Sequence, residues 1–178
     1  MNLFEAIETR YSHKELFLPE PVPMTHLEQI AKAGITAPSG NNRQTVRLII
    51  LPNKEAIKPL NALTPHGGLG STSAAIAVFT DTTLTPDGHM NFDKENYSAA
   101  MQNMLLAATA LGYSSLWLDY IYFNPENEKA AKELLGIPEA CRLWALVPIG
   151  KPDGLGSRRE KLPYEERVFY GNYSAHKS

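Results

Sequence analysis

Four stretches of the sequence are rich in apolar residues, and the first of them, Val46–Leu51, is also rich in β-branched side chains. Such stretches are typical of buried β-strands, because a strand that is covered on both faces does not need alternating polar positions. We expect strands at Val46–Leu51, Ala75–Thr80, Ser114–Ile121 and Arg142–Ile149.

Other stretches place apolar residues three and four positions apart, which predicts helices with one buried face. The first helix is expected from Asn2 to about Glu8, with Asn2 as its cap. The second is expected to open at a capping box, Thr25–Glu28. A third is expected over Asn53–Leu63, and the glycine-rich stretch His66–Ser73 that follows is expected to be a loop.

A long alanine-rich segment is expected to form the central helix. Asn91 or Asp93 can cap it, it runs to Leu111, and Gly112 closes it. The segment is apolar on most faces, which predicts burial nearly all round. In a chain of 178 residues, such a helix indicates the core of a dimer as well as the core of the fold.

The last third of the chain contains one more helix and a different kind of segment. The helix is expected to have Asn124 as its cap and Pro125 as its first residue, and to end at Gly136. Residues 151–178 are polar, with scattered aromatic side chains and no clear periodicity. We expect this segment to be an arm that packs on a partner subunit, with a loose tail as the alternative. The whole, residues 1–178, reads as one α+β domain.

Composition excludes several classes of function. Net charge is −2, so there is no basic field to attract nucleic acid. No stretch approaches the roughly 20 apolar residues that span a bilayer, and we expect a cytoplasmic protein without a membrane partner. The only cysteine, Cys141, precedes an apolar run and is expected to be a buried, inert thiol.

Familiar catalytic motifs are missing. The five histidines show no metal-ligand spacing, so no metal site is expected. There is no nucleophile elbow and no P-loop. Gly154 and Gly156 lack the third glycine and the following helix of a Rossmann site. By these motif rules alone, the sequence indicates only an α+β domain with three unusual polar clusters.

The first cluster is Arg10–Lys14, at the end of the first predicted helix. It combines two cations, a histidine and a hydroxyl group. Arginine and lysine form charge-assisted hydrogen bonds with phosphate, and serine adds a neutral donor. Cations that stabilise a helix C-terminus are the alternative interpretation.

The second cluster is Ala37–Gln44, between a helix and a strand. Its side-chain amides donate and accept hydrogen bonds, which suits a flavin ring edge with both kinds of group. An ordinary turn is the alternative. The third cluster, Ser157–Pro163, gathers three cations in the tail. It is interpreted as a second half of a phosphate clamp, with a solvated charge run as the alternative.

Taken together and in this order, the clusters resemble the motifs of the nitroreductase family of FMN enzymes. Arg10–Lys14 matches R-[RHY]-S-x-[RK], and Ala37–Gln44 matches A-P-S-x-x-N-x-Q. Leu111–Trp117 matches L-G-x-x-S-x-W at the end of an alanine-rich helix. Pro148–Pro152 and Arg158–Glu166 match a G-x-P motif and a basic segment before P-x-E-E. The resemblance covers nearly the whole chain.

The resemblance implies a mixed β-sheet flanked by helices, in an intertwined homodimer that shares two FMN sites. The FMN phosphate and ribityl chain would be held by Arg10, Tyr11, Ser12 and Lys14, with Arg159, Lys161 or Arg158 completing the clamp. The partner subunit would line the flavin with Pro38, Ser39, Gly40, Asn42 and the nearby Gln44. The flavin ring would lie near Trp117, Leu118 and Asp119, with a backbone N–H aimed at flavin N5.

The implied reaction moves hydride from NADH or NADPH through flavin N5 to a nitroaromatic, a quinone or a similar acceptor. One site that serves both partners predicts ping-pong kinetics. The alternatives are an FMN storage or sensor protein, and a flavoenzyme of the same fold with another reaction, such as dehalogenation or flavin oxidation. An interaction module with a basic tail is a further alternative, which the cations near the N-terminus argue against.

Two departures from the family pattern affect the expected site. The family often has Q-P-W where this chain has Gln44, Thr45 and Val46. Many members also place a lysine near the flavin pyrimidine, but the corresponding segment Pro65–Gly70 contains none. His66 or backbone N–H groups would have to take the place of that lysine.

Overall fold

The computed structural model describes residues 1–63, 65–85, 90–119, 123–154, 156 and 158–173. Four strands form an antiparallel sheet in the order β1-β2-β4-β3. The strands are β1 (Val46–Leu51), β2 (Ala74–Asp81), β3 (Ser114–Ser115) and β4 (Cys141–Gly150). The central strand β2 is solvent-free from Ala74 to Val78, because both of its faces are covered.

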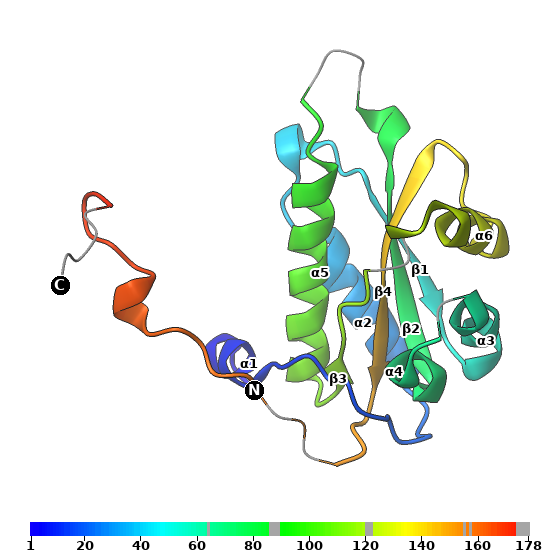
Figure 1. The fold of residues 1–178 in the computed structure, drawn as a ribbon, viewed down its shortest axis with the longest axis horizontal. Helices are drawn as coiled ribbons and strands as arrows, with labels where there is room; N and C mark the ends of the chain where they lie inside the picture. Colours follow the sequence, from blue (N-terminus) through cyan, green and yellow to red (C-terminus); the bar gives the residue numbers. More distant parts are fainter. Residues whose placement is uncertain (64, 86–89, 120–122, 155, 157, 174–178) are drawn as a thin grey trace.

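Helices cover both faces of the sheet (Figure 1). The helices on one face are α2 (Met24–Ile35) and α5 (Asp93–Ala110). Those on the other face are α3 (Lys54–Leu63), α4 (Gly67–Ser71) and α6 (Pro125–Leu135). Each face has its own apolar core, one built around Met101 and Met104 of α5 and the other around Ile57 and Leu60 of α3.

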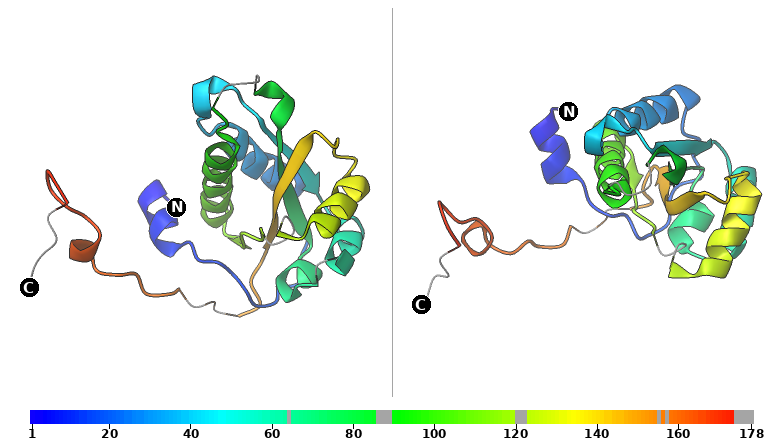
Figure 2. Two further views of the ribbon diagram at one scale, coloured as in Figure 1. Left: turned by 45° about the horizontal axis from the view of Figure 1, so that its top comes forward. Right: turned by 90° about the horizontal axis from the view of Figure 1, so that it is seen from above.

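The N-terminus and the last described residues of the chain lie on the α5 side of the molecule. The helix α1 (Leu3–Thr9) contacts α5, and the C-terminal residues 158–173 extend away from the body as an arm (Figure 2). The segment between α1 and α2 joins the sheet edge through a parallel bridge, Ser12 to Ser115. The mixed sheet expected from the resemblance is therefore not found among the described strands, whose pairings are all antiparallel, and this isolated bridge lies outside the named strands.

Most of the predicted elements are confirmed. β1 has the expected bounds, and β2 and β4 are longer than expected by one residue at each end. The caps of two helices are also confirmed. Asn2 forms a full capping box with Glu5, and the Asn124 side chain accepts hydrogen bonds from the N–H groups of Glu126 and Asn127.

Three local predictions were wrong. The stretch His66–Ser73 is not a loop, because it contains the helix α4, whose N-cap His66 accepts a hydrogen bond from Gly68 N–H. The helix α2 begins at Met24 after Pro23, without a side-chain cap, so Thr25–Glu28 is not a capping box. The N-cap of α5 is Phe92, although the Asn91 side chain accepts a hydrogen bond from the N–H of Asp93, the first residue of the helix, at 2.7 Å.

The predicted strand Ser114–Ile121 is much shorter than expected. Only Ser114 and Ser115 form β3, after which the chain touches β4 again at a single bridge, Leu118 to Leu146. Residues 120 and 121 of this prediction lie outside the described part of the chain. β3 is the edge of the sheet, and in the described part of the chain its outer side is paired only at the bridge between Ser12 and Ser115.

Candidate functional site

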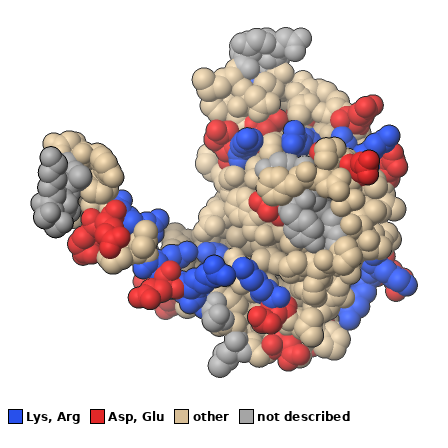
Figure 3. Space-filling view, viewed as in Figure 1, with Lys and Arg blue, Asp and Glu red and all other residues tan. Residues whose placement is uncertain are grey.

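A cationic cleft joins the first and third clusters of the sequence. Its cations come from two segments at opposite ends of the chain, and its volume is about 380 Å³. The residues that line it are Arg10, Tyr11, Ser12, Lys14, Glu15, Gly156, Arg158, Arg159 and Lys161. Figure 3 shows Lys and Arg side chains gathered where the arm meets the body. The tertiary structure therefore brings together two cationic segments that are about 150 positions apart in the sequence.

The N-terminal side of the cleft is held in place by His13. This side chain is buried and its backbone N–H donates to Ser115 O at 3.0 Å. Its Nε2 lies 2.9 Å from Leu16 O, and because a carbonyl oxygen can only accept, Nε2 carries the proton. Ser12 and Lys14, on either side of His13, are exposed and line the cleft.

Tyr11 connects this segment to the sheet. Its hydroxyl group accepts a hydrogen bond from Ser114 Oγ at 3.0 Å, and its ring lies edge-on to that of His13. The C-terminal segment crosses directly over the Tyr11 ring at Gly156, where an added Cβ would overlap the ring atoms. Only glycine permits this approach, so Gly156 positions the arm beside the first cluster.

The three cations of the arm have different surroundings. Arg158 donates a hydrogen bond from Nη1 to Glu8 O, near the C-terminal end of α1, which fixes the arm to that helix. Arg159 and Lys161 are exposed, and their side chains form no hydrogen bond with any residue in the described ranges. The same holds for the side chains of Arg10 and Lys14. Four cations that have no partner among the described residues give the cleft a positive potential, which attracts anions.

The second cluster forms a strained loop at the start of α5. Three of its residues have positive φ angles although none of them is glycine: Asn41 (53°), Asn42 (54°) and Gln44 (51°). Such conformations cluster at ligand sites, because the surrounding structure must hold them. Two hydrogen bonds do so: Gly40 N–H donates to Asn96 Oδ1 at 2.8 Å, and Gln44 N–H donates to Ser39 Oγ at 3.0 Å.

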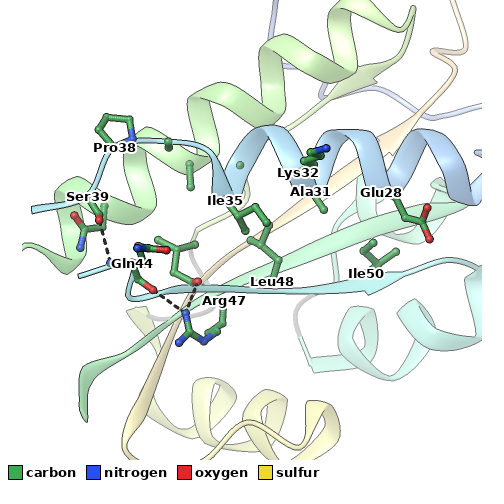
Figure 4. Close-up of a pocket in the computed structure, with 15 residues that line it drawn as sticks. Glu28, Ala31, Lys32, Ile35, Pro38, Ser39, Gln44, Arg47, Leu48 and Ile50 are labelled. Atoms are coloured by element: carbon green, nitrogen blue, oxygen red, sulfur yellow. Dashed lines mark hydrogen bonds between the residues drawn. The ribbon is translucent and has the colours of Figure 1, made fainter. Parts of the chain in front are cut away.

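The loop opens onto an apolar groove of about 640 Å³ between α2 and β1. Figure 4 shows Pro38, Ser39 and Gln44 at one end of this groove, with apolar side chains of α2 and β1 along it. Gly40 and Asn42 do not line the groove. Gly40 instead packs against Phe92 so closely that an added Cβ would overlap its ring.

The strained loop and the cationic cleft lie at opposite ends of α5. The loop is bonded to Asn96 in the first turn, whereas Tyr11 is bonded to Ser114 just beyond the last turn. An 18-residue helix is about 27 Å long at 1.5 Å per residue. Within one chain, the two clusters therefore do not surround a single small ligand.

The residues expected near the flavin ring lie at the sheet edge, outside the cationic cleft. Trp117 is half-buried with its ring edge-on to Tyr97 at 5.7 Å, and Leu118 is buried beside Leu146. Asp119 is half-buried and precedes residues outside the described ranges. The Nε1 of Trp117 is enclosed and has no hydrogen-bond partner among the described residues, which is unusual for an indole.

Other candidate chemistry is limited. Cys141 is buried as expected, and burial, with a smaller effect of Asp81, raises the pKa of its thiol. Among the described residues, no three or more His, Cys, Asp or Glu side chains are grouped to hold a metal ion. None of the described helices is long and apolar enough to cross a membrane.

Sequence reasoning missed the two residues that build the cleft. Gly156 was considered only as part of a dinucleotide motif, and His13 only as one polar residue among several. For Gly156, a signal was available in its position two residues before the basic run. For His13, none was available, because its burial depends on the bridge between Ser12 and Ser115.

The model of the nitroreductase family matches residues 7–66 and 67–151. The chain belongs to the nitroreductase family. The matched nitroreductase region includes the first two clusters and the whole sheet, and it ends before the cationic arm.

Relatives of known sequence agree with this assignment. A protein of Archaeoglobus fulgidus, provisionally named NADH dehydrogenase/NAD(P)H nitroreductase, is 38% identical over 127 residues, which are 71% of this chain and 72% of that protein. A protein of Methanothermobacter thermautotrophicus with the same provisional name is 28% identical over 153 residues, which are 85% of this chain and 78% of that protein.

Solved nitroreductase structures share the fold over the full chain. A nitroreductase from Desulfovibrio desulfuricans, crystallised with FMN, has a TM-score of 0.78 and 28% identity, and the match covers 98% of this chain and 99% of that one. A nitroreductase family protein from Clostridium difficile has a TM-score of 0.80 and 26% identity, with 97% and 99% covered. The α+β nitroreductase fold expected from the sequence is confirmed.

Proposed function

We propose that the protein is an FMN-dependent oxidoreductase that transfers hydride from NADH or NADPH to a nitroaromatic, a quinone or a similar acceptor. The observation that carries this proposal is the cationic cleft, which combines free cations and a serine hydroxyl group from two ends of the chain. This set of donors is typical of a phosphate site.

The cleft fits the phosphate of FMN. Arg10 and Lys14 supply positive charge that has no partner among the described residues, and Ser12 supplies a neutral donor on the same short segment. Arg159 lies next to Arg158, which is bonded to the end of α1 two residues before Arg10. We therefore assign Arg159 as the arm residue that completes the phosphate clamp. The ring of Tyr11 packs against Gly156 and so brings the arm beside the N-terminal segment.

We further propose that the second cluster contacts FMN from a partner subunit. The loop and the cleft are a helix length apart in one chain, but a two-fold axis across α5 would bring the N-terminal end of one helix near the C-terminal end of the other. Pro38, Ser39, Gly40, Asn42 and Gln44 of one subunit would then face Arg10 and Lys14 of the other.

Exposed apolar side chains support the homodimer. The helix α1 exposes Leu3, Phe4 and Ile7 by 61%, 74% and 45%. The arm exposes Tyr170 and Tyr173 by 83% and 80%. Unpaired apolar side chains of this size on two adjoining segments are typical of a subunit interface. We propose that residues 151–178 pack on the partner as an arm, and the cytoplasmic location stays a prediction.

The chain itself supplies binding, orientation and charge. When bound, FMN would supply the redox chemistry, by accepting hydride from the donor and passing electrons to the acceptor. Trp117, Leu118 and Asp119 follow β3 at the sheet edge, and we assign them to the flavin ring. No side chain has to act as a nucleophile, which agrees with the absence of a nucleophile motif from the sequence.

The relatives support both the cofactor and the donor. The Desulfovibrio protein was crystallised with FMN, and a Clostridium difficile protein of similar fold is described as an FMN-dependent nitroreductase. The archaeal proteins are named for NADH and NAD(P)H. The identity of the acceptor and a ping-pong order of reaction remain predictions.

The absorption spectrum of the purified protein tests this function. We expect the yellow spectrum of bound flavin, and bleaching after anaerobic addition of NADH or NADPH. Yellow protein that neither donor bleaches would indicate FMN storage or sensing. A colourless protein that also fails to bind added FMN would contradict the proposal.

A further inference from the structure

A buried asparagine of α5 is bonded to the strained loop at both of its ends. The Asn96 side chain is 2% exposed, and its Oδ1 accepts a hydrogen bond from Gly40 N–H at 2.8 Å. Its Nδ2 donates to Thr45 Oγ1 at 3.0 Å, and Thr45 is fully buried. Because a backbone N–H can only donate, the contact with Gly40 fixes the orientation of the amide and leaves Nδ2 to donate to the threonine.

The two bonded ends enclose the three residues with positive φ angles. Asparagine adopts left-handed conformations more readily than most residues, whereas glutamine rarely does, so Gln44 is the least favourable of the three. Thr45 follows Gln44 directly, and its carbonyl oxygen also accepts a hydrogen bond from Asp81 N–H at 2.9 Å. The residue next to the most strained position is therefore attached both to β2 and to α5.

A proline at position 45 would restrain the loop in another way. The family often has Q-P-W where this chain has Gln44, Thr45 and Val46. A proline ring pushes the residue before it towards an extended conformation, which Gln44, with a φ angle of 51°, does not adopt. Thr45 permits this conformation, and its hydroxyl group supplies a restraint through Asn96 in place of the ring.

We propose that Asn96 and Thr45 are positioning residues that hold the strained loop in its FMN-binding conformation before FMN binds. This inference rests on the proposed function, because the contact between the loop and FMN is itself proposed. A loop that spends only part of its time in the binding conformation lowers the apparent affinity by that fraction. Since strained conformations persist only where the surrounding structure holds them, loss of the Thr45 bond should reduce the fraction.

The test replaces Thr45 with valine, which has a similar shape but no hydroxyl group, and with serine, which keeps the hydroxyl group. For Thr45→Val, we expect FMN to bind the apoprotein about tenfold more slowly in stopped-flow fluorescence, as for a loop that is competent about a tenth of the time. The dissociation rate and the absorption spectrum of the bound flavin should stay unchanged, because the bound loop has the same conformation. Thr45→Ser should bind FMN at nearly the rate of the unmodified protein.

Hydrogen exchange of the apoprotein provides a readout that does not need FMN. The N–H groups of Gly40 and Gln44 are bonded to Asn96 Oδ1 and Ser39 Oγ in the strained loop. Local opening exposes such groups to exchange with solvent. Both should exchange at least tenfold faster in Thr45→Val than in Thr45→Ser.

A general loss of stability would give a different result. Asn124→Ala weakens the cap of α6, far along the chain from the loop, and should leave the FMN association rate unchanged. Equal association rates of Thr45→Val and the unmodified protein would overturn the inference. Unchanged exchange at Gly40 and Gln44, or equal slowing by Asn124→Ala, would also overturn it. If the unmodified protein binds no FMN, the proposed function itself fails.

Discussion

Single residues decide whether the two cationic segments can meet. Gly156 has no side chain where the arm crosses Tyr11, and the buried His13 holds Ser12 and Lys14 at the surface. The chemistry of the cleft belongs to the exposed cations, but its geometry depends on these two residues. Substitutions of the cations should therefore weaken FMN binding by removing charge, and substitutions of Gly156 or His13 should weaken it by changing the shape of the cleft.

Replacing Arg10 with alanine should weaken FMN binding by roughly 1.5–3 kcal/mol, because a hydrogen bond to a charged group is lost. Fluorescence titration of the apoprotein with FMN measures the change in Kd. Arg10→Lys is the matched control, since it keeps the charge and should lose less affinity. Equal FMN affinity in the Arg10→Ala variant and the unmodified protein would refute the role assigned to Arg10.

Replacing Gly156 with alanine should displace the arm from Tyr11 and lower FMN affinity at least tenfold, although no cation is removed. Gly67→Ala is a suitable control, because its added Cβ would meet only Leu16, at 3.7 Å. Unfolding midpoints of both variants should stay close to that of the unmodified protein. An FMN affinity unaffected by Gly156→Ala would mean that the arm does not contribute to the site.

Cys141 should be unreactive in the folded protein. Burial raises the pKa of its thiol, so the thiol stays protonated in the native state near neutral pH, and the thiolate is the reactive form. The unfolded chain loses this proton once the pH passes the ordinary value of 9.0, so the contribution of Cys141 to stability should fall as pH rises above it. Labelling by a disulfide reagent at pH 8 should be slow without urea and fast with it. Rapid labelling of the native protein would contradict the buried position.

At the scale of secondary-structure elements, the helix α6 and the loop Ser39–Gln44 differ in how well their backbone conformations suit their residues. The helix α6 has a polar N-cap, a proline at its first position and a left-handed Gly136 at its end. The loop Ser39–Gln44 instead has three positive φ angles in residues other than glycine. Strain is thus concentrated in the loop that we propose to contact the ligand, whereas the well-capped α6 lies on the other face of the sheet from α5.

The cap of α6 provides a stability test that is independent of the cofactor. Asn124→Ala removes the acceptor of two backbone N–H groups and should lower the free energy of unfolding by about 1 kcal/mol. Urea unfolding at fixed protein and FMN concentrations measures this change. Asn172→Ala in the exposed arm should change it much less. An equal effect of both substitutions would show that the cap does not stabilise the fold.

At the scale of the whole molecule, the fold separates two binding elements that one cofactor would need. The cationic cleft and the strained loop lie at the two ends of α5, and one face of the molecule exposes the apolar side chains of α1. A symmetric dimer resolves both features at once, since each site would then draw on two chains. This arrangement can be tested by mixing defective subunits.

Arg10→Ala damages the cleft, whereas the double change Ser39→Ala and Asn42→Ala damages the loop. Each homodimer should bind FMN weakly. When an equal mixture of the two variants is refolded, about half of the dimers should contain one subunit of each kind. Each mixed dimer has one intact site and one site with both defects. About a quarter of all sites should therefore regain FMN affinity. Separate refolding of each variant is the control. No recovery in the mixture would mean that each site lies within one chain.

The sequence by itself determined the local features of this protein. Apolar runs located β1, β2 and β4, and side-chain caps located the starts of α1 and α6, because these signals act between near neighbours. The motif order also identified the family. The short helix α4 and the early end of β3 were missed, since glycine-rich helices and edge strands depend on the elements packed beside them.

Only the tertiary structure decided how the candidate residues are grouped. It joined Arg10–Lys14 to Arg158–Lys161 through the contact of Gly156 with Tyr11, and it placed Ser39–Gln44 a helix length away. It also showed that Arg158 binds the end of α1 while Arg159 and Lys161 stay unpaired within the described ranges. Sequence patterns report the chemistry of each segment, but distances between segments arise from packing, and packing is a property of the whole fold.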